Sequence, residues 1–178
     1  MTDIYPGYWN RGRALHVIDL ENLAGGRLGW RRARETWLTY ERGIGIQNGD
    51  RAVVVVSTMF AAAVRHVVPS YVRLKFCPPG PDAADRLLQE LAAAEIDRTR
   101  FAMVIIASGD RSFVGTAELA RSRGMNVWLV AGYASVSRKL AAVCPLRSRL
   151  CLPGQRRAAK RATAMHPGAG GSAAAPAA

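Results

Sequence analysis

The sequence predicts an α/β protein, a three-layer α/β/α sandwich with a mostly parallel sheet. Short strand-like and helix-like segments alternate five times along residues 14–152, with short connections. Two of the strand-like runs, at 51–57 and 101–108, are apolar at almost every position, so neither side of them can face water. Strands buried on both faces and joined through helices form right-handed βαβ units, which place helices on both sides of a parallel sheet.

The expected strands share β-branched and aliphatic composition, and turn-forming residues bound them. The run at 71–76 alternates apolar and polar residues, which is typical of a strand nearer the sheet edge. We expect strands at 14–20, 51–57, 71–76, 101–108, 126–132 and 148–152.

The expected helices carry apolar residues at helical spacing. The first should turn Trp30, Ala33, Trp37, Leu38 and Tyr40 inward, and the third should bury Leu87, Leu88 and Leu91. Gly124 is well suited to end the fourth. We expect helices at 30–42, 59–67, 82–95, 110–123 and 134–143.

Length and composition indicate one folded domain followed by a tail. A chain of 178 residues with 49% hydrophobic residues can bury one substantial core. We place this domain at 1–152. Residues 153–178 are rich in Ala, Gly, Pro and basic residues without a periodic apolar face, so we expect a disordered basic tail.

Neither a membrane anchor nor a disulfide framework is expected. No apolar run reaches the ~18 residues that cross a bilayer, and the first residues lack the apolar core of a signal peptide. The three cysteines have no partners at zinc-ligand spacing, which favours reduced structural thiols. These features predict a cytoplasmic protein without membrane contact.

Two aspartates lie where an open parallel sheet gathers ligands. Asp19 follows the first strand and Asp110 follows the fourth, and ligands of such sheets bind at the carboxyl ends of strands where the strand order reverses. No helix is expected directly after Asp19, which favours a ligand role over a capping role. Asp110 precedes a helix and can serve as its N-cap, as a metal ligand, or as both.

Helical spacing separates the two acids of the segment GPDAAD. Asp85 shares a stripe with Leu88 and Ala92 next to the core face, whereas Asp82 lies on a polar stripe. We therefore expect Asp85 to be the ligand and Asp82 to complement the helix N-terminus or to help from the outer shell. Carboxylates that converge from distant segments repel one another, and a hard divalent cation relieves that repulsion.

The basic balance of the chain indicates a polyanion partner. Lys and Arg number 25 against 13 Asp and Glu, for a net charge of +12. Arginine binds phosphate through a planar fork of donors. The candidate phosphate contacts are Arg27, Arg31, Arg32, Arg34 and Arg111. The three histidines fit structural or solvent-exposed positions better than catalytic ones.

The order of the acidic motifs resembles the NYN domain family of the PIN-like nuclease superfamily. IDLEN matches the first motif at Asp19 and Asn22, ADRLL the second at Asp85, and ASGDRSF the third at Asp110. The resemblance covers roughly residues 13–145. It implies a PIN-like, Rossmann-like sandwich and a ribonuclease dependent on Mg²⁺ or Mn²⁺, with Asp19, Asp85 and Asp110 as ligands. Asn22 and Ser108 would orient water or substrate.

One position departs from that family pattern. The family commonly carries a further aspartate two residues after the third acid, and this chain has Ser112 there. Serine is a poorer metal ligand, so two readings stand side by side: an endoribonuclease acting on single-stranded RNA, and an inactive RNA-binding or regulatory module. A phosphatase or nucleotide-binding protein is a third class, for which ENLAGG is a poor phosphate loop. A homodimer is left open.

Overall fold

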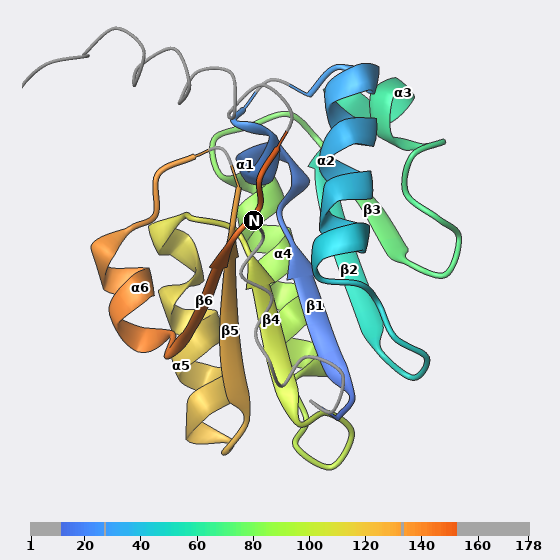
Figure 1. The fold of residues 1–178 in the computed structure, drawn as a ribbon. Coiled ribbons are helices and arrows are strands. Elements are labelled where there is room, and N and C mark those ends of the chain that lie inside the picture. The colour runs from blue at the N-terminus through green and yellow to red at the C-terminus, as the bar shows by residue number, and fades with distance from the viewer. Residues whose placement is uncertain (1–11, 27, 133, 153–178) are drawn as a thin grey trace, which may run out of the picture.

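All six strands of the sheet are parallel in the computed structural model, which describes residues 12–26, 28–132 and 134–152 (Figure 1). The strands lie in the order β3-β2-β1-β4-β5-β6. Their bounds are β1 Ala14–Ile18, β2 Arg51–Ser57, β3 Arg73–Cys77, β4 Met103–Ala107, β5 Asn126–Ala131 and β6 Leu146–Arg149. This order is that of a Rossmann-like doubly wound sheet, so the expected fold class is confirmed.

The central strands β1 and β4 are adjacent, and they flank the point where the strand order reverses. In their register Ile18 lies opposite Ala107. The backbone N–H of Asp19 then donates to the carbonyl of Ala107, at 3.1 Å. The residues that follow these two strands therefore leave the sheet side by side at its carboxyl-terminal edge.

Helices cover both faces of the sheet (Figure 1). One apolar cluster joins a sheet face to α1, α2 and α3, and a second joins the other face to α4, α5 and α6. The alternation of side chains along each strand divides them between these clusters. The bounds are α1 Leu20–Ala24, α2 Trp30–Gly43, α3 Ala61–Val64, α4 Ala83–Glu95, α5 Val114–Ser122 and α6 Arg138–Val143, with 3₁₀ turns η2 Thr58–Phe60 and η3 Arg111–Phe113.

Several predicted elements differ in extent from the observed ones. The first strand ends at Ile18 because the short helix α1 begins at Leu20. The prediction that no helix follows Asp19 directly was therefore wrong. The predicted helix at 59–67 is a 3₁₀ turn followed by one turn of α-helix, and the last strand lies at 146–149 instead of 148–152.

The inward face of α2 also differs from the predicted set. Ala33, Trp37 and Tyr40 are buried as expected, and Thr36 joins them. Trp30, which was expected inward, is 54% exposed, because it is the first residue of the helix and lies beyond the edge of the core.

Polar contacts in the core tie β1 to its neighbours. His16 of β1 is fully buried, and its ring nitrogens lie 2.7 Å from the hydroxyl of Tyr40 in α2 and 3.0 Å from Asp50 before β2. Asp50 also accepts from the backbone N–H of Ala14 and of Gln47. His16 is therefore a structural residue, as expected.

Two of the sequence expectations concern parts of the chain outside the described residues, namely Arg27 and the tail at 153–178. Within the described residues no helix is both long and apolar enough to cross a membrane.

Candidate functional site

Asp19 is held at the carboxyl-terminal end of β1 by hydrogen bonds to both of its carboxylate oxygens. Oδ1 accepts from the backbone N–H of Asn22 at 2.9 Å, which makes Asp19 the N-cap of α1. Oδ2 accepts from the hydroxyl of Ser108, at the end of β4, at 3.0 Å. A carboxylate oxygen has two lone pairs, so each oxygen keeps one acceptor position for a further partner.

The loop after β4 is bound directly to the loop after β1. The side-chain carbonyl of Asn22 accepts from the backbone N–H of Gly109 at 2.8 Å, and the hydroxyl of Ser108 accepts from the N–H of Asp110 at 3.1 Å. A Cβ at position 109 would lie 2.5 Å from the carbonyl oxygen of Ser135, so only glycine fits there. Asn22 thus positions the loop that carries Asp110, a more specific role than orienting water.

Asp110 is exposed and caps η3 through a bond from the backbone N–H of Ser112, at 2.7 Å. The hydroxyl of the same Ser112 lies 3.5 Å from a carboxylate oxygen of Asp85 in α4. Ser112 therefore contacts the second and the third predicted acid together. Ser112 donates a hydrogen bond to each of these acids, whereas an aspartate at this position would add a further negative charge.

The α4 acids divide as helical spacing predicted. The buried residues of α4 include Leu88 and Ala92, and Asp85 shares their stripe and is half-buried. Asp82 precedes the helix, is exposed, and has a left-handed backbone with φ of 53°. It occupies the N-cap position of α4, so its charge lies at the helix N-terminus as expected, although its side chain forms no capping hydrogen bond. Its charge also acts on Asp85.

The electrostatics of Asp19 and Asp85 are those of crowded carboxylates. Burial, the negative charge of Asp85 and that of Glu21 raise the pKa of Asp19 to about 7, against the lowering effect of its bonds from Asn22 and Ser108. Burial, followed by the charges of Asp110 and Asp82, raises the pKa of Asp85 to about 6. Asp19 and Asp85 therefore share one electrostatic environment, to which Asp110 adds its charge beside Asp85, and it disfavours ionisation of both of these carboxyls in the absence of a cation.

A hollow of about 350 Å³ lies at this edge of the sheet, lined by Asp19, Glu21, Asn22, Gly25, Gly26, Ala84, Asp85 and Ala134. Hollows of similar volume lie between β5, β6 and α6 and at the opposite edge of the sheet. Volume alone therefore does not distinguish this one. Its distinction is that two carboxylates with raised pKa line it at the point where the strand order reverses.

Glu21 belongs to this site and was missed in the sequence. It lies in the first turn of α1, and its carboxylate accepts from the backbone N–H of Ser57, the last residue of β2, at 3.0 Å. Its charge also acts on Asp19 and Asp85. The missing signal was α1 itself: if Asp19 is taken as an N-cap, Glu21 falls in the first helical turn.

The donors present are suited to a hard cation such as Mg²⁺ or Mn²⁺, since they are carboxylate and amide oxygens around a crowded negative centre. Among the described residues, however, no group of three His, Cys, Asp or Glu side chains lies close enough as placed to hold a metal ion together. A set of three ligands at this edge would therefore need side-chain movement, which the exposure of Asp110 permits.

The predicted phosphate-binding arginines differ in how far their side chains are exposed to solvent. Arg31 and Arg34 are exposed on α2, beside the exposed Trp30, and Arg111 is exposed in η3. Arg32 is half-buried, and its Nε donates to the carbonyl of Ala24 at 3.0 Å, so it closes the end of α1.

Comparisons with known proteins bear on the fold alone. No family model matches the chain, and no curated protein matches it. A crystal structure of a protein of unknown function from Vibrio parahaemolyticus is similar, with a TM-score of 0.50 at 15% sequence identity, covering 79% of this chain and 94% of that one.

Proposed function

We propose that the protein is a metal-dependent ribonuclease whose acidic centre is built from Asp19, Asp85 and Asp110. The single observation that carries the proposal is that Asp19 and Asp85, from distant segments, line one hollow at the switch point of the sheet, where burial and repulsion from neighbouring acids raise the pKa of both. Maintaining such a centre is unfavourable unless a ligand compensates it, and perturbed acids in a hollow are typical of functional sites. The motif order resembling NYN domains and the net charge of +12 favour a phosphodiester substrate.

The residues of the site have separate tasks in this proposal. Asp19, Asp85 and Asp110 would hold Mg²⁺ or Mn²⁺, which when bound would polarise a phosphate and lower the pKa of a water molecule. Ser108 and the backbone of Asn22 fix the carboxylate of Asp19, and the side chain of Asn22 holds the loop that carries Asp110. Exposed Arg31, Arg34 and Arg111 would contact phosphates of a single-stranded RNA.

A specific observation favours a second candidate, an RNA-binding module that does not cleave. Ser112 bonds to Asp110 through its N–H and reaches Asp85 through its hydroxyl, so a neutral donor occupies the position of a further acid. That arrangement eases the repulsion between the acids without a cation.

The deciding experiment is incubation of the protein with end-labelled single-stranded RNA and DNA in Mn²⁺, in Mg²⁺ or in EDTA. We expect RNA cleavage only with metal, and a loss of at least about 100-fold in Asp19→Asn, because a ligand is removed. Glu118→Gln, which removes one exposed negative charge from α5, is the matched control and should keep the wild-type rate.

The results separate the candidates. Cleavage in EDTA, or wild-type cleavage by Asp19→Asn, would refute the proposed centre. Metal-independent RNA binding without any cleavage would favour the second candidate. In that case Ser112→Asp should bring metal-dependent cleavage above background, since it restores the acid that the family pattern carries at this position.

A further inference from the structure

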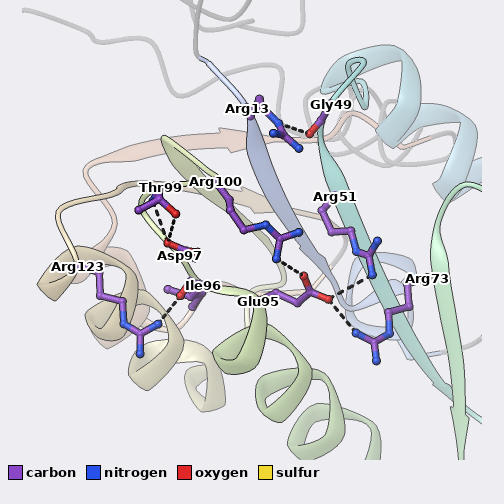
Figure 2. A network of polar contacts seen from close by, with 10 residues as sticks. All are labelled: Arg13, Gly49, Arg51, Arg73, Glu95, Ile96, Asp97, Thr99, Arg100 and Arg123. Carbon is purple, nitrogen blue, oxygen red and sulfur yellow. Dashed lines mark hydrogen bonds and ion pairs between the residues drawn. The ribbon is translucent and has the colours of Figure 1, made fainter.

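Arginines gather at the amino-terminal edge of the sheet, opposite the acidic hollow. Because all strands are parallel, the segments that lead into them meet at this edge. A strand of five to seven residues separates the two edges by roughly 20 Å. The arginines of this edge are Arg13, Arg51, Arg73, Arg98, Arg100 and Arg123, and Figure 2 draws five of them.

The acids at this edge are already bonded and fewer than the arginines. Glu95, at the end of α4, lies 3.3 Å from Arg51, 2.9 Å from Arg73 and 3.5 Å from Arg100, so one carboxylate serves three guanidinium groups (Figure 2). Asp97 accepts from the backbone N–H and the hydroxyl of Thr99. Asp50, just before β2, faces His16. Positive charge therefore remains in excess here.

A hollow of about 430 Å³ lies within this arginine edge, and Arg13, Arg98 and Arg100 line it together with Gly124 and Asn126. The guanidinium groups of Arg13 and Arg100 both lie over the ring of Phe101, at 5.7 and 5.2 Å from its centroid. This stacking orients them through their faces and leaves the N–H groups at their edges to other partners, one of which is Glu95 for Arg100. The Nε of Arg13 donates to the carbonyl of Gly49 at 2.7 Å.

Such a cluster is suited to phosphate. Converging guanidinium groups repel one another unless an anion lies between them, and each can offer two parallel N–H donors to a phosphate. The arginines extend from β3 across β2 and β1 to the loops before β4 and β5, so they span four or more strands at about 4.8 Å each. That width exceeds one phosphate group and matches a run of successive phosphates.

Resting on the RNA substrate of the proposed function, we infer that the arginine edge is a docking surface for the phosphate backbone of single-stranded RNA, with one phosphate seated in the hollow between Arg13, Arg98 and Arg100. Contacts to phosphate carry no base information, so binding there is independent of sequence. The surface is separate from the acidic centre and needs no metal. An RNA strand held at this edge would be retained by the protein whether or not the acidic centre cleaves it.

The test is fluorescence anisotropy of a labelled 20-nucleotide RNA in EDTA, across a series of salt concentrations. Arg13→Gln/Arg98→Gln removes two phosphate contacts. The slope of log affinity against log salt should then fall by about 1.4, and affinity at 0.1 M salt should fall roughly 10- to 30-fold. Arg65→Gln/Lys139→Gln, which removes two exposed charges elsewhere, should weaken binding less than threefold.

Two further variants separate the loss of phosphate contacts from an effect on folding. Arg98→Gln alone leaves the bond from Arg13 to Gly49 intact. It should lower the slope by about half as much as the double variant does, because it removes one phosphate contact instead of two. Arg13→Lys/Arg98→Lys should restore most of the slope, because it keeps both charges. Melting temperatures close to the wild type would exclude misfolding as the cause.

The proposal is overturned if both double glutamine variants bind RNA equally well. The binding of inorganic pyrophosphate is measured with the same variants. The proposal is also overturned if Arg13→Gln/Arg98→Gln loses pyrophosphate binding but keeps RNA binding, since the hollow would then be a site for a small anion. Because the measurement is made without metal, an absence of RNA cleavage leaves it unaffected. Failure of the proposed nuclease and failure of this surface are thus distinguishable.

Discussion

Asp19 accepts hydrogen bonds from two partners, and its pKa is raised further than that of Asp85, the other acid of the hollow with a raised pKa. Its oxygens cap α1 and accept from Ser108, and yet burial and the neighbouring acids raise its pKa to about 7. A capping aspartate normally stabilises a fold when ionised. Here burial and the neighbouring acids disfavour the ionised form, so the cap is weaker at neutral pH than that of an exposed aspartate.

The opposition between helix capping and the raised pKa of Asp19 predicts an unusual dependence of folding stability on pH. The pKa of Asp19 is raised on folding from 3.8 to about 7, so its contribution to stability is present below pH 4 and is lost as pH rises through 7. In EDTA at pH 8 we expect Asp19→Asn to be more stable than the wild type, by on the order of 2–4 kcal/mol. Urea unfolding at pH 4, 6 and 8 measures the difference, and a difference independent of pH would contradict this account.

Gly109 provides a second test at the residue scale. In Gly109→Ala the new Cβ would meet the carbonyl oxygen of Ser135 at 2.5 Å, so the loop must move away from Asn22. We expect a loss of roughly 1–3 kcal/mol in stability, together with reduced metal-dependent activity.

The matched control for that change is Gly115→Ala in α5, where a Cβ would meet nothing within 4 Å. Gly115 lies in the first turn of α5, where alanine should leave stability unchanged or raise it by up to about 1 kcal/mol. Thermal melts of both variants decide the matter. Equal melting temperatures would show that the loop around Gly109 tolerates displacement.

At the scale of elements, β1 is the strand on which the arrangement depends. It lies between β2 and β4, its end presents Asp19, and its buried His16 bonds to α2 and to the loop before β2. α4 connects the two charged edges, with Asp85 in its first turn and Glu95 at its end. Parallel packing of strands and helices therefore brings Asp19, Asp85 and Asp110 to one edge and an excess of arginines over acids to the other.

The bond from β1 to α2 gives a prediction at this scale. Tyr40→Phe removes the hydroxyl that lies 2.7 Å from His16 inside the core, and we expect a loss of about 1–3 kcal/mol in stability. Tyr71→Phe, whose exposed hydroxyl bonds to Glu41, is the control and should change stability by less than about 0.5 kcal/mol. Similar losses in urea unfolding would argue against a special role for the buried bond.

For the whole molecule, the acidic centre predicts that metal binding and folding are coupled. At pH 8 we expect 10 mM Mn²⁺ to stabilise the wild type by about 1.4 kcal/mol if its Kd is near 1 mM, which corresponds to a rise of roughly 3–6 °C in Tm. The rise should shrink at pH 5, because protons compete for the same carboxylates.

The same rise should be absent in Asp19→Asn/Asp85→Asn, because two of the three proposed ligands, both of which line the hollow, are then removed. Differential scanning fluorimetry measures it in both proteins. An equal rise in the wild type and the double variant would place the metal elsewhere on the molecule.

Local composition was sufficient to predict the sheet. The apolar runs of β2 and β4 cannot face water, so burial on both faces, and with it a parallel sheet between helices, follows from the residues themselves. The stripe that places Asp85 beside Leu88 and Ala92 follows in the same way from helical periodicity. Such patterns are readable because each depends on the spacing of residues within one element.

Contacts between distant segments were decided only by the tertiary structure. Whether Ser108 bonds to Asp19, whether Ser112 reaches Asp85, and which arginines gather around Glu95 all depend on how segments from different parts of the chain pack. The arginine edge was missed for that reason, because the fold brings Glu95 to its arginines across 22 and 44 positions of sequence. Glu21 was missed because helix α1 was not predicted. Periodicity carries information over one element, whereas the charge environment of a residue is set by whichever chain segments the fold places beside it.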